Sequence, residues 1–435
     1  MAEKKEVAQN DRIMIDGLSR EDKILIHCAR LNVSPARCET LNGLLAGEPD
    51  WDLLLEKATR PRLSCLVSHH LRSADLRMLV PQKVLQKLQN LYYSSLARNM
   101  LIQDELSHLL AAFNKEGIPV IVLKGAALLG SVYQDISLRP MSDLDILVQP
   151  EHLDRAEAVA FYRGFKYVHS RQSQEIARIK IHQLPYLIHP EKRFVLEIHQ
   201  HIVDVDSPYR FGLGAFWTRA RPNRMFGADA LTLAPEDLLI HLSVHFLFDR
   251  HYQSNSALGQ LCDISEVILH YGNSLDWNLL EKTAKENGIA AGLHCVFYAC
   301  EQLLGTQVPA SVLTQLQPVK FNPSIATLFI RRRVLDTKPW LLLDLISPHL
   351  QYSHLRALLA IVNKVFHIPA RIYQEQQGFR ERKISYYSRL MANIFPTLSR
   401  LLLKPMELRQ DLLLDRWLHD IGSSTTRIGP NRDSH

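Results

Sequence analysis

The stretch that decides the fold is 123–148, LKGAALLGSVYQDISLRPMSDLDILV. The apolar, β-branched run PVIVL at 119–123 leads into it and predicts a buried strand. The alternating run DLDILV at 143–148 predicts a second strand, and the segment 126–133 between them predicts a helix. The middle of the chain therefore predicts strands joined by crossover helices.

Two aspartates start the second of these strands. Side chains alternate along a strand, so Asp143 and Asp145 point to the same face. Two neighbouring carboxylates repel each other, and the arrangement is costly unless a divalent cation lies between them. Hard oxygen ligands of this type suit Mg²⁺ or Mn²⁺. An Asp-x-Asp pair alone is a weak motif, but here it lies in an apolar strand that follows a strand–Lys-Gly–helix junction.

A third acidic residue, Glu197, completes a candidate metal site. The runs 186–189 and 194–199 flank the four residues Pro-Glu-Lys-Arg and predict a hairpin whose second strand carries Glu197. In a compact sheet that strand can lie beside Asp143 and Asp145. Such a site can activate an attacking hydroxyl with one metal and hold the leaving group of a triphosphate with the other. The alternative is that Glu197 faces solvent from an edge strand.

Cationic and small residues supply a candidate phosphate site. Lys124 follows a strand directly and precedes Gly125 and a helix, an arrangement that suits close approach of a phosphate. Lys124 and Arg139 would add positive charge against the phosphates. The alternatives are that Lys124 only extends its stem along apolar surface, and that Arg139 only pairs with one of the aspartates. His199 shares a face with Glu197 and either orients it, contacts a nucleotide or makes a structural hydrogen bond.

The flanking regions read as helical. The segment 84–113 has apolar residues at intervals of three and four, without Pro or Gly, and predicts one long helix that Gly117 ends. After Pro235 the helices are predicted at 237–249, 256–271, 277–287, 291–304, 324–334 and 355–365. The expected fold class is α+β, with a small mixed sheet between helical regions. The expected divisions are an N-terminal helical region at 1–114, the core at 115–225, a helical domain at 226–320 and a basic C-terminal helical arm at 321–435 with a disordered tail.

The motif region resembles a known family. The run 123–148 looks like the bacterial nucleotidyltransferase family related to DNA polymerase β, in the poorly characterised branch with Lys-Gly, a helix with Tyr, then Arg and Asp-x-Asp. LEIHQH at 196–201 resembles its second acidic strand, and the similarity covers roughly 85–305. The wider superfamily usually has Gly-Gly or Gly-Ser where this chain has Lys124-Gly125, and often Asp where it has Glu197.

The resemblance implies a polymerase β-like core that transfers a nucleoside monophosphate from an NTP to an acceptor hydroxyl, with release of pyrophosphate. It implies Asp143, Asp145 and Glu197 as catalytic metal ligands for Mg²⁺ or Mn²⁺. Lys124, Gly125, Arg139 and Ser142 would contact the triphosphate. A different class stays open: a catalytically inactive nucleotide-binding or scaffold protein that retains the fold. The acceptor could be RNA, a protein or a small molecule.

Composition limits the class of protein and its expected location, but it does not identify a binding partner. The 435 residues are 46% hydrophobic and 22% charged, which excludes collagen-like and wholly disordered chains. The six cysteines form no CxxC pair and predict reduced thiols. The absence of a long uncharged apolar stretch or an apolar signal segment predicts a cytoplasmic protein. The net charge of +6 is concentrated in 321–435, which holds 17 Lys and Arg against nine Asp and Glu. This arm is therefore the place where contact with a polyanion is expected.

Overall fold

The computed structural model describes residues 17–59, 62–168, 183–192, 194–203, 211–248, 257–319, 321–331 and 334. The predictions made for the helix at 355–365, for most of the basic arm and for the tail lie outside these residues.

A seven-stranded mixed sheet forms the centre of the described fold, in the order β3-β4-β5-β2-β1-β7-β6. Its strands are β1 (Ile121–Val122), β2 (Asp143–Leu147), β3 (Lys166–Tyr167), β4 (Leu187–Ile188), β5 (Val195–His199), β6 (Arg221–Met225) and β7 (Ala228–Thr232). Strand β2 runs parallel to β5 and antiparallel to β1, and β1 runs parallel to β7. The predicted mixed sheet with flanking helices is confirmed.

The sheet extends further along the chain than the sequence predicted. The predicted hairpin is present, because β4 and β5 pair antiparallel. A second hairpin, β6–β7, was missed, and its β7 pairs with β1 beyond the expected core limit at residue 225. Strand β6 has the sequence RPNRM and is mostly exposed, so it lacks the apolar alternation of a strand, and its Pro222 is tolerated because β6 is an edge strand.

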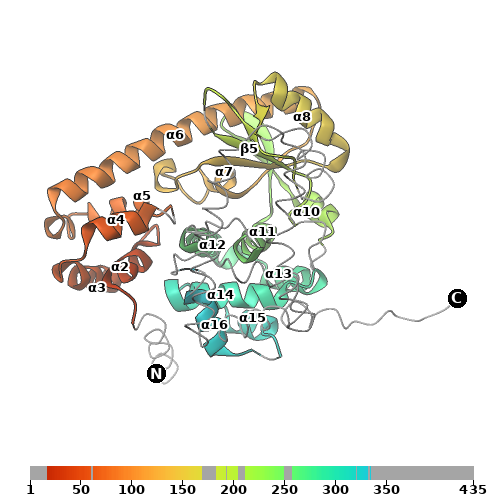
Figure 1. Cartoon of the computed structure of the whole chain (residues 1–435). Coiled ribbons are helices and arrows are strands. Elements are labelled where there is room, and N and C mark those ends of the chain that lie inside the picture. Colours follow the sequence, from red (N-terminus) through yellow and green to blue (C-terminus); the bar gives the residue numbers. More distant parts are fainter. Residues whose placement is uncertain are drawn as a thin grey trace, which may run out of the picture.

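Helices flank the sheet on several sides (Figure 1). Their bounds are α2 (Arg20–Cys28), α3 (Pro35–Ala46), α4 (Trp51–Thr59), α5 (Ser64–Leu71), α6 (Gln82–Lys115), α7 (Lys124–Leu128), α8 (Leu153–Tyr162), α10 (Leu213–Arg219), α11 (Pro235–Phe248), α12 (Ala257–Tyr271), α13 (Trp277–Glu286), α14 (Ala290–Leu304), α15 (Ala310–Leu316) and α16 (Pro323–Ile330). The 3₁₀ turns are η1 (Arg77–Leu79), η2 (Ile136–Leu138), η3 (Pro150–His152) and η4 (Gly272–Ser274).

The long helix α6 connects the N-terminal helices to the sheet. In Figure 1 it runs from above α4 and α5 to the sheet beside α8. It confirms the helix predicted at 84–113, and Gly117 follows it in the left-handed conformation with φ +63°. Its inner face buries Leu88, Ile102 and Leu109, which contribute to one hydrophobic core shared with the sheet.

The helix after the Lys-Gly junction is shorter than predicted and starts earlier. Helix α7 begins at Lys124 and ends at Leu128, where the sequence predicted 126–133. Leu129 leaves the helical conformation and Gly130 takes a positive φ of +77°, so the chain turns back at this point. This early start puts Lys124 itself at the helix N-terminus, next to the sheet.

The second helical group lies on the opposite side of the sheet from α8 and contains α11 to α16 (Figure 1). All six cysteines are free thiols, and five of them are buried. Within the described residues no helix combines the length and apolar character needed to cross a membrane.

Candidate active site

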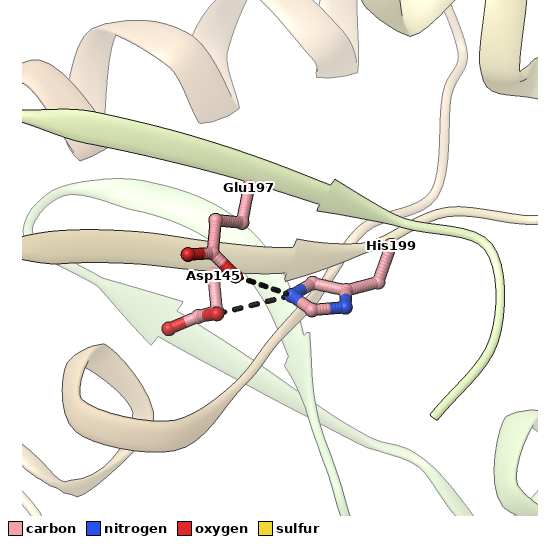
Figure 2. A group of neighbouring side chains, drawn as sticks. All are labelled: Asp145, Glu197 and His199. Carbon is pink, nitrogen blue, oxygen red and sulfur yellow. Dashed lines mark hydrogen bonds and ion pairs between the residues drawn. The ribbon is translucent and has the colours of Figure 1, made fainter. Parts of the chain in front are cut away.

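The pairing of β2 with β5 brings two predicted carboxylates together. Parallel pairing places Asp145 directly opposite Glu197. His199 lies two residues beyond Glu197 on β5 and therefore shares its face. Figure 2 shows the three side chains converging from the two neighbouring strands. The sequence prediction that the Glu197 strand lies beside the Asp145 strand is confirmed.

The three side chains are close and largely buried. His199 Nε2 lies 3.0 Å from Asp145 Oδ1 and 3.5 Å from Glu197 Oε2. The exposed fractions of the side chains are 4% for Asp145, 13% for Glu197 and 1% for His199. Their candidate ligand atoms all lie within 4.8 Å of one another, the one such His, Cys, Asp or Glu group of three in the described residues.

Lys124 reaches the same carboxylates from the start of α7. Its Nζ lies 2.6 Å from Asp145 Oδ1 and 3.7 Å from Glu197 Oε2. The backbone holds this position, because the N–H of Leu123 donates to the carbonyl of Asp145 at 3.0 Å. We call Lys124, Asp145, Glu197 and His199 the carboxylate cluster.

Burial and charge act against each other on the pKa values in the carboxylate cluster. Burial alone would lower the pKa of Lys124, but the carboxylates of Asp145 and Glu197 raise it above its ordinary value. Burial would raise the pKa of Asp145, yet Lys124 and His199 hold it well below its usual range. Burial would lower the pKa of His199, and hydrogen bonds to Asp145 and Glu197 outweigh it. At neutral pH the cluster therefore contains an ammonium against ionised Asp145.

Asp143 lies at the outer end of the same strand face. Its side chain is 30% exposed, and Arg62 Nη1 approaches its Oδ1 to 3.6 Å. Arg62 Nη2 also donates to the hydroxyl of Ser142 at 2.8 Å. Arg62 belongs to the N-terminal helical region and takes a left-handed conformation with φ +60°. The N-terminal region thus contributes a cation to the outer end of the site.

Arg139 has a different partner from those that the sequence suggested. Its Nε lies 3.0 Å from both carboxylate oxygens of Asp263 on α12, and its Nη2 donates to Oδ2 at 2.7 Å. Tyr133 donates to Asp263 Oδ1 at 2.8 Å. A Cβ added to Gly125 would lie 2.1 Å from Arg139 Nη1. The missing side chain of Gly125 therefore makes room for this guanidinium.

Helix α6 fastens the loop that enters β2. Asn99 Nδ2 donates to the carbonyl oxygens of Ile136 and Arg139, at 2.6 and 2.9 Å. Arg98 Nε donates to the carbonyl of Met141 at 2.9 Å. These bonds fix the backbone immediately before the two aspartates, so the position of Asp143 and Asp145 depends on α6.

The structure divides the predicted site residues into three groups. Lys124, Asp145 and Glu197 meet inside the carboxylate cluster. Asp143 and Ser142 lie at its outer end, and Gly125 and Arg139 pack against each other. Sequence reasoning missed two participants, Arg62 and Asp263, which no local motif links to the aspartates.

The residues fit a divalent cation by their chemistry. Asp143, Asp145 and Glu197 offer carboxylate oxygens on one face of two neighbouring strands, which are hard ligands suited to Mg²⁺ or Mn²⁺. The three carboxylates outnumber the lysine and the arginine, Lys124 and Arg62, that pair with them, so negative charge remains for another cation. The outer end is the more exposed and is where a polyphosphate can approach.

Comparison with known proteins identifies a family. The family described as uncharacterised nucleotidyltransferase matches residues 47–305, which is more than half of the chain. No curated protein matches. A solved structure of the antibiotic-resistance factor ANT(2'')-Ia is similar at 11% sequence identity, over 44% of this chain and 99% of that one, with a TM-score of 0.27. A similarity this low carries no inference about substrates.

Proposed function

The chain belongs to the uncharacterised nucleotidyltransferase family, and from this premise we propose that it transfers a nucleoside monophosphate from an NTP to an acceptor hydroxyl, releasing pyrophosphate. The observation that carries the proposal is the parallel register of β2 and β5, which sets Glu197 opposite Asp145 with Asp143 on the same face. Three carboxylates in this arrangement are expensive to hold together unless they serve cations.

The proposed metal ligands are Asp143, Asp145 and Glu197, and Mg²⁺ or Mn²⁺ is the ion that their oxygens suit. When bound, such an ion polarises phosphoryl oxygens and stabilises the charge of the leaving pyrophosphate. The transfer forms a bond between the acceptor oxygen and the α-phosphorus. The bond from the α-phosphorus to the bridging oxygen breaks, and its electron pair leaves with pyrophosphate. We assign the proton of the acceptor hydroxyl to a carboxylate, Glu197.

The residues proposed to bind or support the triphosphate lie at the outer end of the site and at the Lys124–Gly125 junction. Ser142 is exposed, and Arg62 holds its guanidinium beside it, which supports a phosphate contact by both. Lys124 is the proposed cation at the buried carboxylates, Asp145 and Glu197. Gly125 and Arg139 enter the proposal together, because Arg139 packs against Gly125 and supports the Lys124–Gly125 junction.

The test is to incubate the full chain with labelled NTPs and Mg²⁺ and to measure nucleotide binding and pyrophosphate release. Asp143→Asn should lower the transfer rate about 100-fold or more, because charge stabilisation by a held metal is worth several kcal/mol. The matched control is Asp52→Asn, which removes an exposed aspartate paired with Lys87 and should leave the rate unchanged. No nucleotide binding by the wild type, with no effect of Asp143→Asn, would refute the proposal.

The acceptor needs a separate experiment. RNA, protein and small-molecule fractions from cells expressing the wild type or Asp143→Asn can be compared by mass spectrometry. A nucleotide adduct that is present only with the wild type would identify the acceptor class. The basic residues of 321–435 favour a polyanionic acceptor or partner.

A second candidate function has one specific observation in its favour. The Lys124 ammonium pairs with Asp145 and Glu197, two of the three proposed metal ligands, and therefore competes there with a catalytic metal ion. Metal-dependent NTP binding without pyrophosphate release, in the presence of every acceptor fraction, would favour this function over transfer.

A further inference from the structure

We propose, building on the function above, that the Lys124 ammonium is a resident cation of the site. The ammonium takes the cation position between Asp145 and Glu197. The site then binds one divalent ion, held by Asp143 and Asp145, instead of the two ions that three carboxylates could hold without the lysine. Glu197 pairs with Lys124 and is not required as a ligand of that ion, which narrows the ligand set given above.

The first support is the position of the ammonium. Lys124 Nζ lies 2.6 Å from Asp145 Oδ1 and 3.7 Å from Glu197 Oε2, so it contacts both members of the facing pair. The same two oxygens also meet His199 Nε2, at 3.0 and 3.5 Å. A divalent ion seated between Asp145 and Glu197 would share these oxygens with the ammonium and would be repelled by it.

The second support is the backbone of Lys124, which is independent of its side chain. Lys124 takes a left-handed conformation with φ +45°. Glycine adopts this conformation readily, whereas a residue with a Cβ is strained in it. Strain of this kind persists where the surrounding structure and the function of the side chain require it. A lysine here is explained if its ammonium is needed at the carboxylates.

The third support is the contrast between the two ends of the acidic face. Lys124, Asp145 and His199 are buried or nearly so, while Asp143 is 30% exposed. Asp143 makes its ion pair with Arg62, whose side chain is itself 39% exposed. Lys124 and Arg139 also act on Asp143 electrostatically. Mg²⁺ keeps several waters and takes further ligands from substrate phosphates, so the exposed end is the one that suits it.

The experiment counts bound Mn²⁺ per chain by electron paramagnetic resonance, with a non-hydrolysable NTP analogue present. The wild type should bind one ion. Lys124→Met, which keeps the length of the stem and removes the charge, should bind two. Two ions in the wild type, or one ion in Lys124→Met, would overturn the proposal.

The matched control is Lys192→Met. Lys192 is another partly buried lysine that contacts two carboxylates, Asp104 and Glu105, away from the site. Its removal should leave one bound ion. Two ions in this variant would show that the gain in Lys124→Met has another origin and would overturn the proposal.

Two further variants keep the test valid if Lys124→Met does not fold, which thermal unfolding followed by circular dichroism detects. Asp143→Asn should bind no ion, whereas Glu197→Gln should still bind one. Equal losses in both variants would overturn the proposal. Failure of the proposed function is distinct, since the wild type would then bind neither the analogue nor Mn²⁺.

Discussion

Two groups of charged side chains meet at the Lys124–Gly125 junction, one through Lys124 and one through Arg139, which packs against Gly125, and they are built differently. In the carboxylate cluster the ammonium of Lys124 contacts both Asp145 and Glu197. In the second group, the guanidinium of Arg139 meets the carboxylate of Asp263 through several hydrogen bonds. We call this second group the Arg139 pair.

The difference lies in charge balance and in geometry. The Arg139 pair matches one cation with one carboxylate in the fork-like arrangement that arginine favours, so its charges are satisfied. The carboxylate cluster has more carboxylates than lysines, and a lysine ammonium is a compact charge on a flexible stem. We infer that the Arg139 pair holds the junction in place, whereas the carboxylate cluster keeps its lysine and retains negative charge that can bind a divalent ion. The following four changes test this distinction.

The largest effect is expected from removing the charge of Asp263. Asp263→Asn leaves a nearly buried guanidinium without its counter-ion and should lower the free energy of unfolding by about 3–5 kcal/mol. Glu197→Gln is the matched change in the carboxylate cluster and should alter it by less than about 1 kcal/mol, because it also relieves repulsion. Urea denaturation measures both. Equal losses would remove the distinction between the two groups.

A smaller effect is expected from exchanging the cation of the Arg139 pair. Arg139→Lys keeps the charge but cannot donate from two nitrogens at once, and should cost about 2–3 kcal/mol. Arg155→Lys, at an arginine whose side chain is 51% exposed, should change stability by less than about 0.5 kcal/mol. Thermal unfolding of the two variants compares them. An unchanged stability in Arg139→Lys would mean that the charge at this position is sufficient and that the paired hydrogen bonds are not needed.

The fit of Gly125 against Arg139 gives the next effect. Gly125→Ala puts a Cβ 2.1 Å from Arg139 Nη1 and 2.9 Å from Met141 Sδ, and should cost about 1–2 kcal/mol. The control is Gly43→Ala in α3, where nothing lies within 4 Å of the new Cβ. That change should stabilise by about 0.5–1 kcal/mol, because alanine favours the helix. In denaturation experiments, Gly125→Ala should lower the free energy of unfolding and Gly43→Ala should raise it.

The smallest effect separates the backbone of Lys124 from its charge. Both Lys124→Gly and Lys124→Ala lose the ammonium, but only glycine fits φ +45° without strain. Lys124→Gly should therefore be more stable than Lys124→Ala by about 1 kcal/mol. At Lys57, inside helix α4, the order should reverse by a similar amount. The same order at both positions would mean that Lys124 is not strained.

What the sequence predicted depends on short-range pattern. The alternation of DLDILV placed Asp143 and Asp145 on one face, and the same period put His199 on the face of Glu197. The hairpin turn after residue 189 was readable because apolar runs flank it. These features are encoded by residues that are close together in the sequence, and all of them are present in the structure.

Other features depend on contacts that no local pattern records. Arg139 meets Asp263, 124 positions later, and a lone aspartate in an apolar helix gives no sign of its partner. Arg62 reaches Ser142 from a separate helical region, 80 positions away. Strand β6 is polar because it is an edge strand. The left-handed backbone of Lys124 was likewise hidden, since lysine is not a residue that indicates such a conformation.

The separation of Arg139 from its partner also has a consequence for the order of events during synthesis. Lys124 and Asp145 are 21 positions apart, so their contact can form early on a growing chain. The partner of Arg139 is made much later, and long-range contacts of this kind form slowly. A nascent chain that ends between residues 199 and 263 therefore carries its acidic face but not the ion pair that secures the junction. We expect the site to mature only after α12 has left the ribosome.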